Sequence, residues 1–272
     1  MPALPRIPYA LLACWKRTAM SRRSRTIRLP PPFLKRAWLP TISQDAELDW
    51  NAYPLSLPIV QNEGLDLTFG KAITIIVGEN GSGKSTILEA LATMAGFSES
   101  GGAAGMRAVA PSVASGEDGA RLGELLKAAW LPQVKHGWFF RAESFFSVAR
   151  YLDEMGSLRA GYLRASHGEG FFSFFEERLT EPGLFILDEP ESALSPAKQF
   201  EFLKLLRQLQ RAGTCQIIMA THSPILMALP DADLWQLDEF GFRPTAIEQT
   251  AHFKLYREFV LYPHETVETM ID

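Results

Sequence analysis

The chain has 272 residues, of which 47% are hydrophobic and 21% are charged, a balance that is ordinary for a globular protein with a sizeable core. Its length fits one large α/β domain or two small ones, and no apolar stretch approaches the roughly 20 residues that a membrane helix needs. Nine basic residues and no acidic one precede Asp45, so the remainder carries 18 of the 27 Lys and Arg residues against all 31 Asp and Glu. This acidic body does not support nonspecific nucleic-acid binding, although it leaves room for a local basic groove.

The N-terminal residues 1–29 form a basic leader that we predict to be disordered, since three prolines among the first eight residues oppose an amphipathic helix. Residues 30–272 are predicted to form a single domain, within which about 97–165 would be a flexible loop and a helical subdomain. The two cysteines, Cys14 and Cys215, have neither metal-ligand nor disulfide spacing. This spacing favours a reducing compartment, and we expect the protein to be cytoplasmic without direct membrane insertion.

Three segments are predicted before the first motif. Pro30–Pro40 is rich in proline and is expected to be an extended connector. Apolar and polar residues alternate in Gly64–Phe69, as in a half-buried strand. Ala72–Val77 is a short apolar, β-branched run that is typical of a buried parallel strand, and Thr86–Ala95 then has helical spacing.

The segment between that strand and that helix reads GENGSGKST and fits the phosphate-binding loop pattern G-x-x-x-x-G-K-[ST]. A strand, a glycine-rich turn and a helix start direct backbone N–H groups and the positive end of a helix dipole at one point, which suits a triphosphate. We expect Lys84 to reach the β- and γ-phosphates and to assist catalysis, and the Ser85 hydroxyl to bind Mg²⁺. The predicted nucleotide-binding residues here are Gly78, Glu79, Asn80, Gly81, Ser82, Gly83, Lys84, Ser85 and Thr86.

Less regular sequence follows the predicted helix. Gly96–Gly119 is rich in Gly, Ala and Ser and is expected to be a long surface loop. Leu122–Trp130 is predicted to be a short helix and Gly137–Arg141 a compact apolar strand. Ser144–Met155 and Phe171–Leu179 are predicted to be helices.

A second motif occupies Leu184–Pro190, which reads LFILDEP. Four apolar residues predict a buried strand, and Asp188 and Glu189 stand at its carboxyl end, the edge where open α/β sheets bind ligands. Asp188 is placed to hold Mg²⁺, and Glu189 is our candidate for the general base that polarises the attacking water.

A third apolar strand is predicted at Gln216–Ala220, and His222 follows it. Because the carboxyl ends of parallel strands converge on one crevice, we expect His222 to contact the γ-phosphate. The C-terminal part is expected to finish the sheet and to add a helix near Phe253–Val260. His252 and His264 have no ligand spacing, so we expect them to be isolated surface or structural residues.

A phosphate loop, then Asp-Glu-Pro after one strand, then Thr-His-Ser after another, resembles the ABC-type ATPases, and in particular a group of small stand-alone bacterial predicted ATPases with an ABC-like head. That family carries a signature loop before the acidic pair. Ser166 and Gly168 match it, whereas Ala165 and His167 depart from its usual leucine and glycine. The resemblance implies that Ser166 and Gly168 bind the nucleotide held by a second subunit.

The resemblance also implies a loop residue that binds the metal, after a strand between the phosphate loop and the signature loop. Glu143, which follows Gly137–Arg141, is the candidate, and Gln133 is the alternative. The implied fold is an α/β P-loop NTPase with a mostly parallel central sheet, a small antiparallel β part and a short helical subdomain.

The implied activity is ATP hydrolysis with ATP and Mg²⁺ bound in a head-to-tail homodimer, together with a protein partner that the sequence does not identify. Three functions remain open. One is a soluble switch or motor in a process such as DNA maintenance or defence, and another is the ATP-binding subunit of a transporter with a separate permease. The third, a degenerate module that binds the nucleotide without hydrolysing it, is disfavoured because all the expected catalytic residues are in place.

Overall fold

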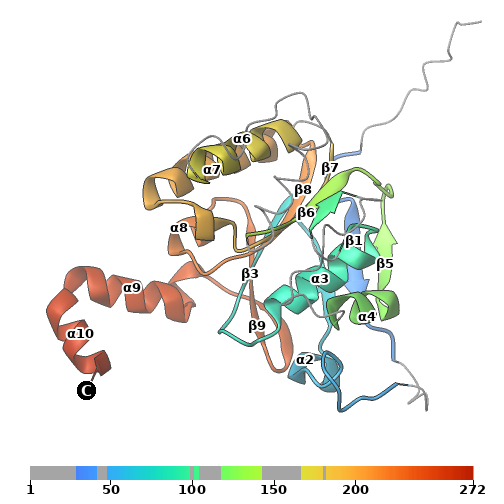
Figure 1. Cartoon of the computed structure of the whole chain (residues 1–272), viewed down its shortest axis with the longest axis horizontal. Coiled ribbons are helices and arrows are strands. Elements are labelled where there is room, and N and C mark those ends of the chain that lie inside the picture. The colour runs from blue at the N-terminus through green and yellow to red at the C-terminus, as the bar shows by residue number, and fades with distance from the viewer. Residues whose placement is uncertain are drawn as a thin grey trace, which may run out of the picture.

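A computed structural model of the chain describes residues 29–41, 48–98, 101–103, 118–142, 167–179 and 182–271. A seven-stranded sheet lies at the centre of the molecule (Figure 1). In spatial order its strands are β10 (Gly241–Pro244), β9 (Asp233–Asp238), β3 (Ile73–Val77), β8 (Cys215–Ala220), β7 (Gly183–Asp188), β6 (Gly137–Arg141) and β4 (Gly102–Ala103). The five central strands run parallel, and the two outer strands pair antiparallel with their neighbours. The predicted α/β fold with a mostly parallel central sheet is therefore confirmed.

The apolar strands of this sheet are buried because layers cover both of its faces. Every residue of β3, β7 and β8 is buried. Along β3, Ile73, Ile75 and Val77 belong to one hydrophobic core and Ile76 to the other. This alternation follows from the two-residue period of a strand, and continuous apolar runs are what a parallel sheet covered on both sides requires.

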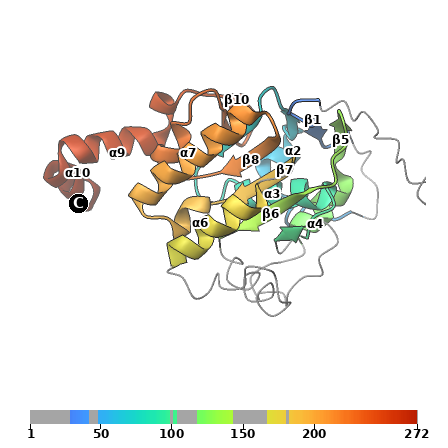
Figure 2. The ribbon, with the colours of Figure 1, turned by 90° about the horizontal axis from the view of Figure 1, so that it is seen from above.

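Helices make up much of both layers (Figures 1 and 2). On one face lie α3 (Lys84–Met94) and α4 (Asp118–Leu125), and on the other lie α6 (His167–Arg178), α7 (Pro196–Ala212) and α8 (Pro224–Met227). The bounds of α7 follow from its sequence: the Ser195 side chain caps the first turn, Pro196 opens the helix, and Gly213 ends it with a positive φ of 61°. The aromatic rings of Phe174, Phe175 and Phe202 pack together beneath α6 and α7.

A second, three-stranded antiparallel sheet has the order β2 (Asp66–Thr68), β1 (Leu34–Trp38) and β5 (Lys127–Trp130). Two predictions were wrong here. The expected connector Pro30–Pro40 contains β1, and the expected helix Leu122–Trp130 ends at Leu125 before β5 begins. The Lys-Ala-Ala-Trp segment favours a helix by intrinsic propensity, but pairing with β1 overrides that preference.

One buried side chain joins the small sheet to the large one. Gln216 on β8 is fully buried, and its Oε1 accepts hydrogen bonds from the backbone N–H groups of Phe33 and Leu34, both at 2.8 Å. Its Nε2 donates to the Leu34 carbonyl at 3.0 Å. The amide therefore satisfies three backbone groups at the entrance to β1, which would otherwise be buried without partners.

The C-terminal part finishes the sheet with β9 and β10, as predicted, and then forms two helices where one was expected. These are α9 (Ala251–Leu261) and α10 (Pro263–Ile271), which project from the body as a hairpin (Figures 1 and 2). Short helices complete the description: α2 (Pro58–Gln61), η1 (Pro190–Ala193) and η2 (Ile247–Gln249). Within the described ranges no helix is both long and apolar enough to cross a membrane.

Candidate nucleotide-binding site

The phosphate loop connects the end of β3 to the first residue of α3, as the sequence predicts. Gly83 has a φ of 92°, a conformation that L side chains rarely adopt, and a Cβ added to Gly78 would lie 2.9 Å from Ser82 Oγ. The N–H groups of the first turn of α3 have no acceptor within the helix and form an anion site at its N-terminus. Ser82 Oγ is buried without a hydrogen-bond partner among the described residues. The loop therefore has the shape and the polar atoms that suit a phosphate group.

Lys84 lies across this loop. Its Nζ donates to the carbonyl oxygens of Gly78 at 2.9 Å and Glu79 at 2.8 Å, and the residue is only 6% exposed. Burial lowers the pKa of Lys84, while the charges of Glu189 and Asp188 oppose that shift. The amino group is thus held at the loop, where the carboxylates at the end of β7 act on its charge.

Ser85 and Asp188 meet between the loop and β7. The Ser85 hydroxyl donates to Oδ1 of Asp188 at 3.2 Å, and Asp188 is 6% exposed. A serine hydroxyl and a carboxylate are hard oxygen ligands that suit Mg²⁺, which takes its remaining ligands from water and phosphate oxygens. In the described part of the chain no group of three or more His, Cys, Asp and Glu residues could hold a metal. A metal here would depend on Ser85, Asp188 and the bound phosphates.

Arg141, at the end of β6, is a site residue that the sequence analysis missed. It pairs with Glu89 of α3 through Nη1, and its Nε lies 3.7 Å from Oδ2 of Asp188. The side chains of Arg141 and Glu89 are 13% and 11% exposed, so this cation is shared by two mostly buried carboxylates. Its position in the sequence gave a hint, because Arg141 is the last residue of a predicted strand, as Asp188 is. In the structure the two residues pair across the sheet.

Glu189 follows β7 in a strained conformation. Its φ is 48°, in the left-handed region, which is uncommon for a residue other than glycine. Its side chain is 43% exposed, and its Oε1 lies 3.5 Å from Nε2 of His222. The Ser192 hydroxyl donates to the other carboxylate oxygen at 3.4 Å. The backbone turn therefore presents this carboxylate at the open edge of the sheet, beside the predicted histidine.

His222 is held on both sides. Its backbone N–H donates to Oε1 of Glu191 at 2.6 Å, and its Nδ1 lies 2.8 Å from Nε2 of His252. His252 was expected to be isolated, and that expectation was wrong, because the start of α9 folds back onto the site. Burial lowers the pKa of both histidines, and the charge of Lys84 lowers each further. Burial raises the pKa of Glu191, a residue that only its place after Asp-Glu-Pro could have suggested.

Tyr53 adds a contact that no sequence motif indicated. Its hydroxyl forms a hydrogen bond with Oγ1 of Thr86, the last residue of the phosphate loop. Tyr53 is 46% exposed, and the loop contact joins residues that lie 33 positions apart. A half-exposed aromatic ring therefore stands beside the phosphate loop.

Some predicted site residues are not placed. Ser166 and Glu143 lie outside the described residues, as does the predicted helix Ser144–Met155. Gly168 lies in the first turn of α6, and Gln133 is exposed between β5 and β6. The part of the site that a second subunit would complete therefore stays a prediction.

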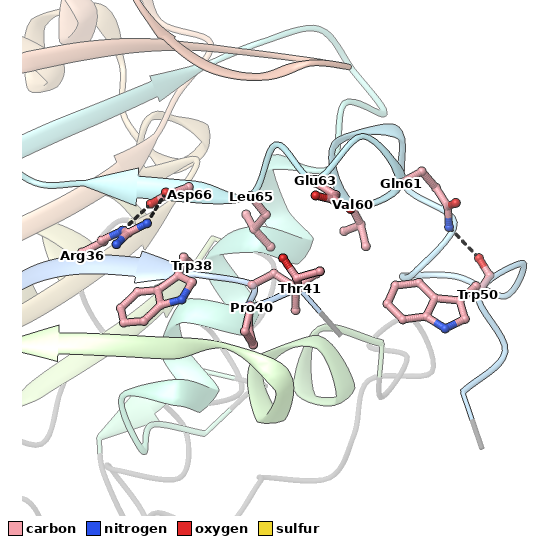
Figure 3. Close-up of a pocket in the computed structure, with 11 residues that line it drawn as sticks. Arg36, Trp38, Pro40, Thr41, Trp50, Val60, Gln61, Glu63, Leu65 and Asp66 are labelled. Atoms are coloured by element: carbon pink, nitrogen blue, oxygen red, sulfur yellow. Dashed lines mark hydrogen bonds and ion pairs between the residues drawn. The ribbon is translucent and has the colours of Figure 1, made fainter. Parts of the chain in front are cut away.

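A cavity of about 530 Å³ lies elsewhere, at the edge of the small sheet (Figure 3). Arg36 pairs there with Asp66 through two hydrogen bonds of 2.8 and 2.6 Å and stacks over the ring of Trp38. None of the residues that line this cavity belongs to the phosphate loop or to the strand ends that carry Asp188 and His222. This cavity is therefore separate from the cluster of charged groups at the phosphate loop.

Two family models match parts of the chain. One is described as "AAA domain, putative AbiEii toxin, Type IV TA system" and matches residues 170–228, and the other is described as "AAA domain" and matches residues 56–114. The first match contains the acidic pair and His222, and the second contains the phosphate loop. The phosphate loop, the acidic pair and His222 thus fall inside matched segments, whereas Tyr53, Arg141 and His252 lie outside them.

The chain also has similarity to curated relatives and to solved structures. The chain is 25% identical over 190 residues to the zinc import ATP-binding protein ZnuC of Saccharophagus degradans, which covers 62% of this chain and 67% of the relative. It is 41% identical over 56 residues to the OLD nuclease of Thermus scotoductus, covering 21% of this chain and 11% of the nuclease. Among solved structures, cbiO1 of Clostridium perfringens, part of the ABC transporter complex cbiONQ, aligns with a TM-score of 0.42 at 19% identity, covering 76% of this chain and 91% of that one.

Proposed function

As this chain is an ABC-type P-loop ATPase, we propose that it hydrolyses ATP to ADP and phosphate with Mg²⁺, as a cytoplasmic switch or motor in a process such as DNA maintenance or defence. The observation that carries the reaction is the convergence of five side chains at three strand ends. Lys84 and Ser85 follow β3, Asp188 ends β7 and Glu189 follows it, and His222 follows β8. The parallel pairing of β3, β8 and β7 brings these three strand ends to one edge of the sheet, and each of them carries a side chain that suits phosphate or metal binding.

Each residue has a role in this proposal. Lys84 Nζ and the N–H groups of the loop hold the β- and γ-phosphates, and Ser85 and Asp188 hold the metal ion. When bound, Mg²⁺ neutralises charge that develops on the phosphate oxygens. Glu189 accepts the proton of the attacking water, and His222 donates from Nε2 to a γ-phosphate oxygen. Arg141 keeps Asp188 in place from the opposite side.

The proposed active form is a head-to-tail homodimer. Glu189 and His222 stand at an exposed edge of the sheet, which leaves room for a second subunit to cover the γ-phosphate. Ser166 and Gly168 of that subunit would then contact the nucleotide. Because the second subunit would contact the γ-phosphate, ATP binding would favour the dimer, and hydrolysis would favour its dissociation. Closure of the dimer would also exclude water from the site.

The comparisons with known proteins bear on the process that ATP hydrolysis would drive. The short similarity to an OLD nuclease and the family description that names an AbiEii toxin both favour a defence or nucleic-acid context. The longer similarity to ZnuC favours the alternative, in which the chain is the ATP-binding subunit of a transporter with a separate permease.

Two experiments test the proposal. The first measures phosphate release by the purified full chain with ATP and Mg²⁺, where a rate no higher than that of Glu189→Gln would refute the reaction. The second captures partners of Glu189→Gln from the lysate of the native host with ATP and Mg²⁺ present, because this variant is expected to hold the closed state. A soluble protein or nucleic acid that binds only with ATP would support the switch, and a permease would establish the transporter alternative.

A further inference from the structure

We propose that His252 is a positioning residue for catalysis, which holds His222 in the tautomer that directs an N–H group at the γ-phosphate. This inference rests on the proposed ATPase reaction and assigns a role to a residue outside the motifs. His252 lies on α9, the first helix of the C-terminal hairpin, and not on any strand end of the site.

The geometry is a short chain of polar atoms. Nε2 of His252 lies 2.8 Å from Nδ1 of His222, and the two ring centroids are 4.9 Å apart. On the other side of the same ring, Nε2 of His222 lies 3.5 Å from Oε1 of Glu189. The His222 ring therefore has one nitrogen directed at His252 and the other at the catalytic carboxylate.

The chemistry of imidazole makes these two contacts dependent on each other. A neutral ring has one nitrogen that donates and one that accepts. The Glu189 carboxylate and a phosphate oxygen are both acceptors, so His222 can face them only with a proton on Nε2. Its Nδ1 must then accept, and His252 satisfies it by donating from Nε2. Without this donor, His222 could place its proton on Nδ1 and turn a lone pair toward the carboxylate.

Electrostatics favour a neutral pair. Burial lowers the pKa of both histidines, and the positive charge of Lys84 acts on each in the same direction. The carboxylates of Glu189, acting on His222, and Glu79, acting on His252, oppose the shift but do not reverse it. Two neutral rings at 2.8 Å are compatible only with one donor and one acceptor between them.

The start of α9 fixes the place of His252. Thr250 caps the helix: its Oγ1 accepts from the N–H of Phe253 at 3.2 Å and donates to the carbonyl of Ile247 at 2.7 Å. Thr250 is 2% exposed, whereas no residue of α9 itself is buried. The helix is therefore anchored at its first turn, where His252 stands, and this anchor sets the ring against the site.

The test compares three replacements of His252. Phenylalanine keeps a ring and cannot donate, glutamine donates from its amide, and glutamate differs from glutamine by one group and only accepts. We expect His252→Phe and His252→Glu to lower kcat at least about tenfold, since a catalytic histidine in the wrong tautomer loses much of its rate. Glutamine should restore most of the rate, and the Kd for ATP should change less than about twofold in all three. His264→Phe, an exposed histidine on the other helix of the hairpin, is the control.

The glutamine and glutamate variants keep the test decisive if the phenylalanine variant fails to fold. A double variant, His222→Ala with His252→Phe, should be no slower than His222→Ala alone, because His252 acts through His222. Long-range ¹H–¹⁵N NMR of the imidazoles supplies a readout besides turnover, with His222 protonated at Nε2 in the wild type and no longer held in that form in His252→Glu.

The outcomes separate the two proposals. No hydrolysis by the wild type would refute the ATPase, while the NMR tautomer would still test the role of His252. If His222→Ala slows hydrolysis but His252→Glu matches the wild type in rate and tautomer, His252 has no positioning role.

Discussion

Ser85 and Asp188 are 103 residues apart in sequence, yet the hydroxyl of one donates to the carboxylate of the other at 3.2 Å. The contact joins the phosphate loop, which follows β3, to the acidic motif at the end of β7. Between these two strands lies β8, which pairs in parallel with both. The relative position of the two oxygen ligands therefore depends on the register of the sheet. The predictions below follow from this site and from the contacts that support it.

Replacing Glu189 with glutamine should lower the hydrolysis rate at least about 100-fold, because an amide cannot accept the proton of the attacking water. ATP binding should be retained, since the residue is half-exposed and lies beyond the loop. Single-turnover hydrolysis and equilibrium binding of a fluorescent nucleotide measure the two effects. Glu201→Gln on the outer face of α7 is the matched control, and normal turnover in Glu189→Gln would remove Glu189 from its role.

Replacing Lys84 with alanine should weaken ATP binding at least about tenfold, because the loop loses the cation that holds the phosphates. Lys204→Ala, an exposed lysine on α7, should bind as the wild type does. Titration of a fluorescent nucleotide without turnover gives both affinities. Equal affinity of the two variants would place the nucleotide elsewhere.

Arg141→Met should reduce the free energy of unfolding by about 2–4 kcal/mol, because it removes the cation shared by two mostly buried carboxylates. Urea unfolding at neutral pH measures the change. Adding Glu89→Gln to the same chain should recover part of the loss by removing one buried negative charge. A double variant that is less stable than Arg141→Met would show that this electrostatic account is wrong.

Gln216→Leu should destabilise the chain by about 2–4 kcal/mol, since Leu has nearly the same volume but leaves buried N–H and C=O groups of β1 without partners. The matched control is Gln210→Leu on α7, because the side-chain amide of Gln210 donates its hydrogen bond to the Pro230 carbonyl at the exposed surface. Hydrogen exchange should show faster exchange at Phe33 and Leu34 in Gln216→Leu. Protection there equal to that in the wild type would contradict the joining role.

Stability should also fall in mildly acidic solution because of the histidine pair. The folded-state pKa values of His222 and His252 lie below their ordinary value of 6.5, so the unfolded chain binds more protons once the pH falls through 6.5. The contribution is complete above that value and is lost toward the lower folded-state values. Each unit of pKa difference corresponds to about 1.4 kcal/mol.

The measurement compares the wild type with a His222→Gln, His252→Gln double variant by urea unfolding at pH 7.5 and 5.5. The raised pKa of Glu191 acts in the opposite direction, but it is present in both proteins. The wild type should lose more stability than the variant between the two pH values, and equal losses would show that the pair does not titrate in this way.

The sequence by itself determined the parts of the site that local patterns encode. The phosphate loop needs glycines, a lysine and a hydroxyl at fixed positions between a strand and a helix. Asp188 ends one apolar run and His222 follows another, and both runs are typical of buried strands. Strand periodicity and loop chemistry act over a few residues, so a single amino-acid sequence is enough to predict them.

The tertiary structure alone decided which distant residues support that site. Arg141, Tyr53 and His252 carry no motif, and their contacts arise from strand order and from the return of α9 to the sheet. Likewise, β5 is a strand only because β1 is available to pair with it. The place of Arg141 at the end of a predicted strand brings it near the site, but the partners of these residues depend on free energies summed over the whole fold, which a local pattern does not contain.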